Sequence, residues 1–254
     1  MRLFQRLALP SRRDSAVEAL EDPVHPAEPA VDVIGGGKYF VGDTHLRLGV
    51  PGTVLATVTP RRVAVQDLPM DNKVMARLDE AVSSGALVRV HHSGIRDADR
   101  LDGFVVGTSA AWTLIALCSD VQLDGWAAVR TADISKVRWR GGEDSLTVRA
   151  LRRRGLWPAR APQPELALDG LAELAEGASG AFGLVSVHVE RHAPDACWIG
   201  EVAAVRPKSL RLREVDPDAR WQPKPSKFPF KHVTRLGFGG RYERTLLEFA
   251  GPNR

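Results

Sequence analysis

An internal repetition with a spacing of 97 residues constrains the fold of this chain more than any other feature of its sequence. Leu87 recurs as Leu184, and Gly103, which opens the run Gly-Phe-Val-Val, recurs as Gly200. At a spacing of 96, Leu114, Asp120, Ile134 and Val137 match Leu210, Asp216, Phe230 and Val233. Because a hydrophobic pattern, a glycine and an aspartate keep their places while most other residues change, the sequence predicts a duplicated fold.

The composition is that of an ordinary globular protein. The 254 residues are 44% apolar and 26% charged, enough for two small globular units or one larger one. The longest apolar runs, such as residues 110–118, are about half of the 20 or so residues that span a bilayer. No apolar core of signal-peptide length follows the N-terminal arginines, because Pro10 interrupts it. We therefore predict a cytoplasmic protein without a membrane span, in which Cys118 and Cys197 are free thiols rather than a bridge.

Shifts in composition divide the chain into five segments. Residues 1–32 combine scattered charge with four prolines and predict a mobile tail. Residues 33–69 alternate apolar and polar positions between glycines and predict a strand-rich N-terminal segment. Residues 70–157 and residues 165–254 are each predicted to form a helix followed by a small barrel, joined by the proline-rich linker of residues 158–164. The predicted fold class is therefore mainly β with short helices (α+β).

Each copy is predicted to contain one helix and then five short strands. An N-cap at Asp71, an apolar stripe and Gly85 predict a helix over residues 71–83, and the leucines of residues 166–175 predict its counterpart before Gly177 and Gly180. The first set of strands is 86–92, 103–108, 112–119, 125–131 and 136–140, with a 3₁₀ turn at 131–134. The second set is 183–191, 199–205, 209–215, a proline-rich stretch ending at 228–230, and 232–238. The arginine-rich residues 146–156 predict a helix that closes the first copy.

This order of elements resembles the small five-stranded bent barrel of the Sm-like fold. The residues that carry the resemblance are Gly103-Phe-Val-Val-Gly107, Trp112-Thr-Leu-Ile-Ala-Leu117, and the segment from Asp124-Gly125-Trp126 to Val137. Glycines at the start of the second and fourth strands relieve crowding where such strands bend. The resemblance covers residues 70–140 and, with fewer matches, residues 165–240, and it implies two tandem barrels.

The Sm-like resemblance also implies RNA binding, but the residues of the family's uridine pocket do not match. Sm proteins carry an aspartate and an asparagine after the second strand and an arginine-glycine pair after the fourth. The corresponding loops here are Ser109-Ala-Ala111 and Thr131-Ala-Asp133, with Arg130 close to the second. Related SH3-like barrels mostly bind proteins or serve as scaffolds, so the fold alone does not decide the ligand.

We identify no catalytic, cofactor-binding or metal-binding residues in the sequence. Gly42-Asp-Thr-His45 resembles a fragment of a metallophosphoesterase motif, but the further histidine segments of a dinuclear site are missing. Gly35-Gly-Gly-Lys38 lacks the serine or threonine that follows the lysine of a phosphate-binding loop. His91 and His92 are adjacent on a predicted strand, so their rings point to opposite faces and cannot easily share one metal.

The candidate functional surface lies in the basic part of the second copy, where residues 206–244 contain 11 Lys or Arg and four Asp or Glu. The candidate nucleic-acid-binding residues are Arg220, Trp221, Lys224, Lys227, Phe228 and Lys231. Aromatic faces can stack on bases while cations meet phosphates. The alternative is that Phe228 and Phe230 alternate into the barrel and that the lysines face water and protect an edge.

Two functions follow from these observations. The first is a non-enzymatic binding or scaffolding protein built from duplicated Sm-like barrels, with another protein or a second copy of itself as its partner. The alternative is RNA or single-stranded nucleic-acid binding through the basic second barrel. An enzyme with a constellation that the sequence does not reveal stays open as a third interpretation.

Overall fold

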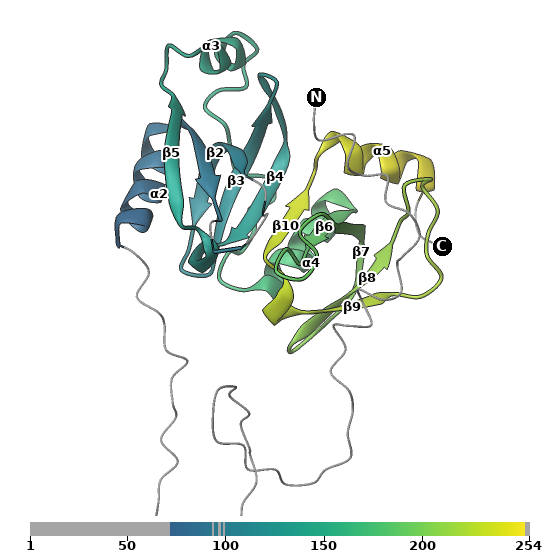
Figure 1. The fold of residues 1–254 in the computed structure, drawn as a ribbon. Helices are drawn as coiled ribbons and strands as arrows, with labels where there is room; N and C mark the ends of the chain where they lie inside the picture. Colours follow the sequence, from purple (N-terminus) through teal and green to yellow (C-terminus); the bar gives the residue numbers. More distant parts are fainter. Residues whose placement is uncertain (1–71, 93, 96–97, 99, 252–254) are drawn as a thin grey trace, which may run out of the picture. The chain divides into compact units, whose positions relative to one another are not determined.

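The computed structural model describes residues 72–92, 94–95, 98 and 100–251 (Figure 1). The predicted tail of residues 1–32 and the predicted strand-rich segment of residues 33–69 lie outside the described residues. The described chain is mainly β, with ten antiparallel strands in one sheet, four α-helices and two 3₁₀ turns. None of its helices has the length and apolar content that crossing a bilayer requires.

The elements follow one another in two series, which we call the first half (residues 72–157) and the second half (residues 165–251). The first half contains α2 (Asn72–Ser84), β1 (Leu87–His91), β2 (Leu101–Thr108), β3 (Trp112–Ser119), β4 (Gln122–Arg130), η1 (Thr131–Asp133), β5 (Lys136–Gly141) and α3 (Leu146–Arg153). The second half contains α4 (Leu171–Phe182), β6 (Val185–His188), β7 (Cys197–Arg206), β8 (Ser209–Glu214), β9 (Ser226–Pro229), η2 (Phe230–His232), β10 (Arg235–Phe238) and α5 (Arg241–Ala250).

The ten strands lie in the order β5-β1-β2-β3-β4-β10-β6-β7-β8-β9. The five strands of each half therefore have the same order, with β10 in the place of β5, and the halves join where β4 pairs with β10. The prediction of two separately closed barrels is not confirmed, because the sheet is open and ends at β5 and β9. The physical reason is that the edge of β4 that would have to close onto β5 is occupied by β10 instead.

At two glycines in equivalent positions of the halves, the neighbouring strand lies too close to leave room for a side chain. A Cβ atom on Gly103 would lie 2.2 Å from the carbonyl oxygen of Ala116, and one on Gly200 would lie 2.1 Å from that of Arg213. The strand register then shifts between Val105 and Gly107 in β2 and, 97 residues later, between Val202 and Ala204 in β7. Each half thus bends its second strand with the same combination of a close approach and a bulge.

The correspondence between the halves changes after their third strands. The predicted spacing of 96 is wrong. In the third strands it is 97, since Leu114 pairs with Gly107 as Arg211 pairs with Ala204, and η1 and η2 start 99 residues apart. Val137 pairs with Val90 as Leu236 pairs with Val187, so Leu236 rather than Val233 is its counterpart. The reason is that the connection between β8 and β9 is longer than the turn between β3 and β4, which a comparison of residue types alone cannot locate.

The helices cover the sheet through apolar stripes. The predicted helix over residues 71–83 is confirmed as α2, which lies against β2 and β5, and its Val74, Leu78 and Ala81 share one buried cluster with strand residues such as Val105 and Val137. The second predicted helix begins later than expected, at Leu171, and runs through both glycines to Gly183, where φ is +78°. No prediction was made for α5.

The core is continuous across the junction of the halves. Trp112, Leu114 and Ala128 of the first half share one buried cluster with residues of the second half, including Leu210 and Phe238. The rings of Trp126, Phe182 and Phe238 also meet there, with centroids 5.3–6.2 Å apart. Burial of this apolar surface makes the junction part of the folded core.

Candidate functional site

The six residues predicted to bind nucleic acid lie in the connection between β8 and β9, in β9 and in η2. Arg220, Lys224 and Lys231 are exposed, and Lys227 is half-buried beside Arg211 of β8. The carboxylate of Asp216 accepts hydrogen bonds from the backbone amides of Asp218 and Arg220 and so holds the turn. The structure therefore places the four cations along one stretch of the second half.

The two predicted stacking aromatics of this stretch are occupied by packing. Phe228 is fully buried in the core, with its ring centroid 5.5 Å from that of Trp198. Trp221 is half-buried against α5 residues, and its Nε1 donates a hydrogen bond to the carbonyl of Gly251 at 3.2 Å. Neither ring can stack on a base without leaving these contacts. Of the features predicted for this surface, only the positive charge of its four cations is available to a ligand.

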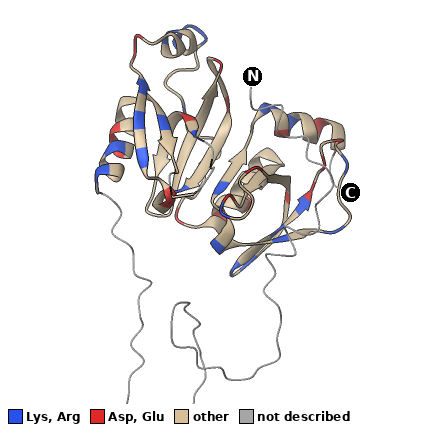
Figure 2. Cartoon of the chain, in the orientation of Figure 1, with Lys and Arg blue, Asp and Glu red and all other residues tan. Residues whose placement is uncertain are grey.

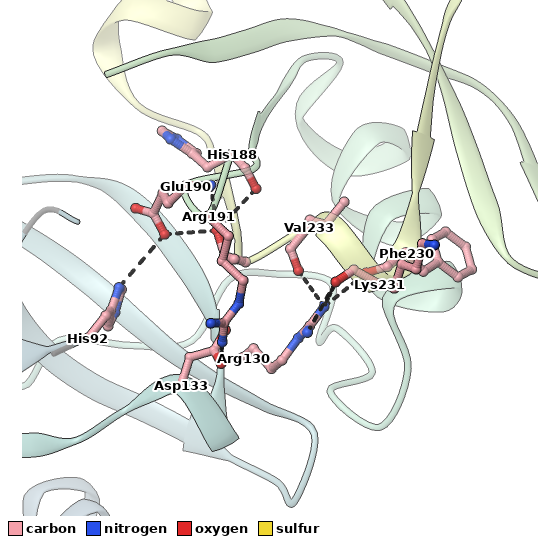
Figure 3. A network of polar contacts seen from close by, with 10 residues as sticks. His92, Arg130, Asp133, His188, Glu190, Arg191, Phe230, Lys231 and Val233 are labelled. Atoms are coloured by element: carbon pink, nitrogen blue, oxygen red, sulfur yellow. Dashed lines mark hydrogen bonds and ion pairs between the residues drawn. The ribbon is translucent and has the colours of Figure 1, made fainter. Parts of the chain in front are cut away.

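A buried polar network lies where the two halves meet (Figure 3). Glu190, which follows β6, has a fully buried carboxylate. It accepts a hydrogen bond of 2.8 Å from Thr234 Oγ1 and forms an ion pair of 3.1 Å with Arg235 Nη2. His92, the residue after β1 in the first half, places its Nδ1 3.8 Å from the same carboxylate. The carboxylate thus has a hydrogen-bond donor and an ion-pair partner from the second half and lies close to a histidine of the first half, so its buried charge is compensated.

Two arginines extend this network across the junction. Arg130, the last residue of β4, donates through Nη2 to the carbonyls of Phe230 at 2.9 Å and Val233 at 2.6 Å. Arg191 forms an ion pair with Asp133 of η1. Each arginine therefore connects the 3₁₀ turn of one half to the other half (Figure 3). We interpret the network as the structural element that sets how the halves pair.

His188 adds a pH dependence to the junction. Burial lowers the pKa of His188 well below the ordinary value of 6.5, and the positive charge of Arg235 lowers it further. The ring nitrogen Nδ1 lies 3.0 Å from Arg235 Nη2, an arrangement that suits a neutral ring accepting from the guanidinium. The folded protein therefore resists protonation of a histidine that the unfolded chain protonates freely.

This pKa shift predicts acid sensitivity. Above pH 6.5 the ring is neutral in both states, and below it only the unfolded chain binds the proton. We expect the free energy of unfolding to fall as the pH drops below this value, by at most about 1.4 kcal/mol per pH unit. Urea unfolding across this range checks the slope. A His188→Gln variant, which keeps an acceptor for Arg235, should show a smaller slope, and an unchanged slope would contradict the assignment.

A second basic surface, on β1, on β5 and at the residue before β2, is not among the sequence predictions. We call it the basic strip: Arg89, Arg100, Lys136, Arg138 and Arg140. Figure 2 shows the Lys and Arg positions along β5. Burial lowers the pKa of His91, and the positive charges of Arg138, Arg100, Arg89 and Lys136 lower this pKa further. Arg89 forms an ion pair with Asp102.

The pairing of β1 with β5 places like charges opposite one another. Arg89 lies opposite Arg138, and His91 lies opposite Lys136. Such pairs disfavour the sheet slightly. Lys136, Arg138 and Arg140 are exposed, and the structure records no acidic partner for them among the described residues. An anionic ligand would relieve this accumulation of charge.

The signal for the basic strip was present in the sequence. The sequence predicts the strand of residues 136–140, and its basic residues alternate, which in a regular strand places them on one face. What the sequence did not show is that this strand lies at the edge of the sheet and beside Arg89.

Among the described residues, no three His, Cys, Asp or Glu side chains are grouped so that they could hold a metal ion. No protein-family profile, no curated protein sequence and no solved structure matches this chain.

Proposed function

We propose that this chain is a non-enzymatic binding or scaffolding protein, built from two tandem Sm-like units, that binds another protein. The observation that carries the proposal is the pairing of β4 with β10, through which one unit receives a strand of the other. A unit whose sheet edge pairs with a polypeptide strand is suited to recognising polypeptide strands.

The tandem Sm-like architecture is supported by three features that recur in both halves. These are the order of the five strands, the 3₁₀ turn before the fifth strand, and the glycine and bulge in the second strand. A common ancestral unit explains why all three occur at nearly constant spacing.

The scaffolding role is supported by the continuous core and the buried network at the junction. Buried polar groups that depend on one another favour a single relative arrangement of the elements that carry them. The halves are thus suited to present their outer edges, β5 and β9, in a constant relation within the unit.

The experiment for this proposal starts from the intact chain. In-cell crosslinking identifies candidate partners, and each candidate is then purified and mixed with the chain across a series of salt concentrations. We expect a stoichiometric complex whose affinity changes little with salt, as for an interface with an apolar centre. Failure of every purified candidate to form such a complex would contradict protein binding.

Nucleic-acid binding is the second candidate, favoured by the four cations Arg220, Lys224, Lys227 and Lys231. Because Phe228 and Trp221 are packed, this site would depend on phosphate contacts rather than on stacking. Binding through such contacts weakens steeply with salt, with a slope close to the number of phosphates neutralised.

Fluorescence anisotropy with short single-stranded RNA and DNA separates the two functions. We expect weak binding at low salt that disappears at physiological salt, because stacking does not contribute. A triple variant, Lys224→Glu, Lys227→Glu and Lys231→Glu, should remove this weak binding. Tight binding that persists at physiological salt and is lost in the triple variant would instead favour the nucleic-acid function.

A further inference from the structure

We propose that the free edge of β5 receives an extended, acidic segment of a partner protein as an additional strand, with the carboxylates of that segment facing Lys136 and Arg138, next to Arg140. The inference rests on the proposed protein-binding function and names the site and the chemistry of the partner.

The first argument is that β5 occupies the place in the first half that β10 occupies in the second. Val137 pairs with Val90 of β1, and Leu236 pairs with Val187 of β6, in equivalent registers. The outer edge of β10 is paired with β4 along four residues. The outer edge of β5 ends the sheet, so the backbone edge that accepts a strand in one half is open in the other.

The second argument concerns the backbone groups at this edge. The carbonyl of Val137 accepts a hydrogen bond of 2.9 Å from Nη1 of Arg77, an exposed residue of α2. A carbonyl bound to this side chain faces away from β1, and the amide of the same residue points the same way in a strand. An exposed arginine can move aside at little cost, so an incoming strand can replace its hydrogen bond with a backbone one.

The third argument is charge. Lys136 and Arg138 are two residues apart in β5 and share one face at a repeat of about 6.7 Å, and Arg140, the extra residue at the register shift of β5, adds a third positive charge next to them. Side chains at every second position of an added strand have the same repeat. A segment with an acidic residue at every second position therefore meets Lys136 and Arg138 in register, and its negative charge also screens the like charges of the basic strip.

The opposite face of β5 indicates that the partner strand also carries an apolar residue. Trp139 is 41% exposed and occupies the position that corresponds to Phe238 in β10, since Val88 and Val185 are their respective partners. Phe238 lies opposite Trp126 of β4, with the ring centroids 6.2 Å apart. We therefore expect an aromatic or large apolar residue of the partner strand opposite Trp139, between two acidic positions.

A second copy of the chain fits this edge poorly. A second copy offers two free edges, β5 and β9. Pairing β5 with a second β5 would bring the cations of two basic strips together, and β9 contains Lys227 and Pro229 and follows Lys224 and Pro225. Proline lacks the amide that strand pairing needs, and the lysines would face the cations of β5. The charge of the site selects a different, acidic polypeptide.

The test uses the full chain and a fluorescein-labelled peptide of about eight residues that alternates Glu with Val and carries one central Phe. We expect saturable binding by anisotropy. The triple variant Lys136→Glu, Arg138→Glu and Arg140→Glu should bind roughly a hundredfold more weakly, because attraction becomes repulsion. The matched control is Arg206→Glu, Lys208→Glu and Arg211→Glu, which makes the same change of charge at exposed positions of β7, of the turn that follows it and of β8, and should stay within about twofold of the unaltered chain. Circular dichroism verifies that both variants are folded.

Hydrogen exchange distinguishes strand addition from charge attraction alone. Addition of the peptide should slow exchange at the amides of Val137 and Trp139. A peptide with N-methyl groups on alternate amides keeps its charge but should neither bind nor protect. Protection at these two amides that is lost with the methylated peptide supports the proposal.

Three outcomes would overturn the inference. The first is equal binding of the methylated peptide, which would leave only electrostatic attraction. The second is binding of short RNA that the β5 variant loses, together with no binding of the peptide, which would assign the basic strip to nucleic acid. The third is self-association of the chain that the β5 variant abolishes. If a purified partner protein nevertheless binds the chain at another surface, the proposed function stands while this inference fails.

Discussion

Replacing Glu190 with alanine is expected to lower the free energy of unfolding by about 3–5 kcal/mol. The Glu190 carboxylate is fully buried and pairs with Arg235, whose side chain is 8% exposed. Alanine removes the carboxylate and leaves the guanidinium in a site where water cannot replace its partner. Urea denaturation followed by far-UV circular dichroism measures the change. The halves should also exchange hydrogen faster at the β4–β10 pairing, since the network lies beside it.

Two further variants show whether burial is the cause. Glu143→Ala removes the carboxylate that pairs with Arg152, but these side chains are 69% and 47% exposed, so the expected loss is at most about 1 kcal/mol. The double variant Glu190→Leu with Arg235→Met replaces both charges by apolar groups and should cost less than Glu190→Ala. A loss for Glu190→Ala as small as that for Glu143→Ala would contradict the role of the network.

The second large effect is expected for Gly103→Ala, which should destabilise the chain by about 3 kcal/mol. Its new Cβ would lie 2.2 Å from the carbonyl oxygen of Ala116, and backbone in the middle of a sheet has no room to retreat. Gly200→Ala should behave alike, because its Cβ would meet the carbonyl oxygen of Arg213 at 2.1 Å. Thermal and urea denaturation of each variant give the change in stability.

Gly180→Ala serves as the matched control for this pair. Gly180 is exposed in α4, and a Cβ there would meet nothing within 4 Å. The same chemical change should raise stability by about 0.5–1 kcal/mol, because alanine favours the helix. If the two strand glycines tolerated alanine as well as Gly180 does, the close approach of the strands would not be what requires them.

The sequence predicted every described strand, although not the sheet that they form. Alternation of apolar and polar residues marks the strands of the first half, and β1, β3 and β5 match their predicted ranges within a residue at either end. Gly103 and Gly200 were recognised by their spacing, and the structure shows the close backbone contact that explains them. The prediction for β9 was less complete, since prolines obscure the alternation there.

The candidate site was predicted with less success, for a reason that Phe228 illustrates. On sequence grounds its ring could stack on a base or enter the core, because neighbouring residues in a strand face opposite sides. The structure buries it beside Trp198, from a strand about 30 residues earlier in the chain. Such contacts between distant segments decide burial, so composition alone could not separate the two roles.

What the sequence by itself determined is local: the period of the strands, the apolar stripe of α2, and the two glycines without which a strand cannot bend. Only the tertiary structure decided that β4 pairs with β10, that Glu190 is buried between the halves, and that β5 is an edge carrying the basic strip. The physical reason is that alternation fixes which face a side chain takes, whereas the neighbour of a strand depends on packing between residues far apart in the chain.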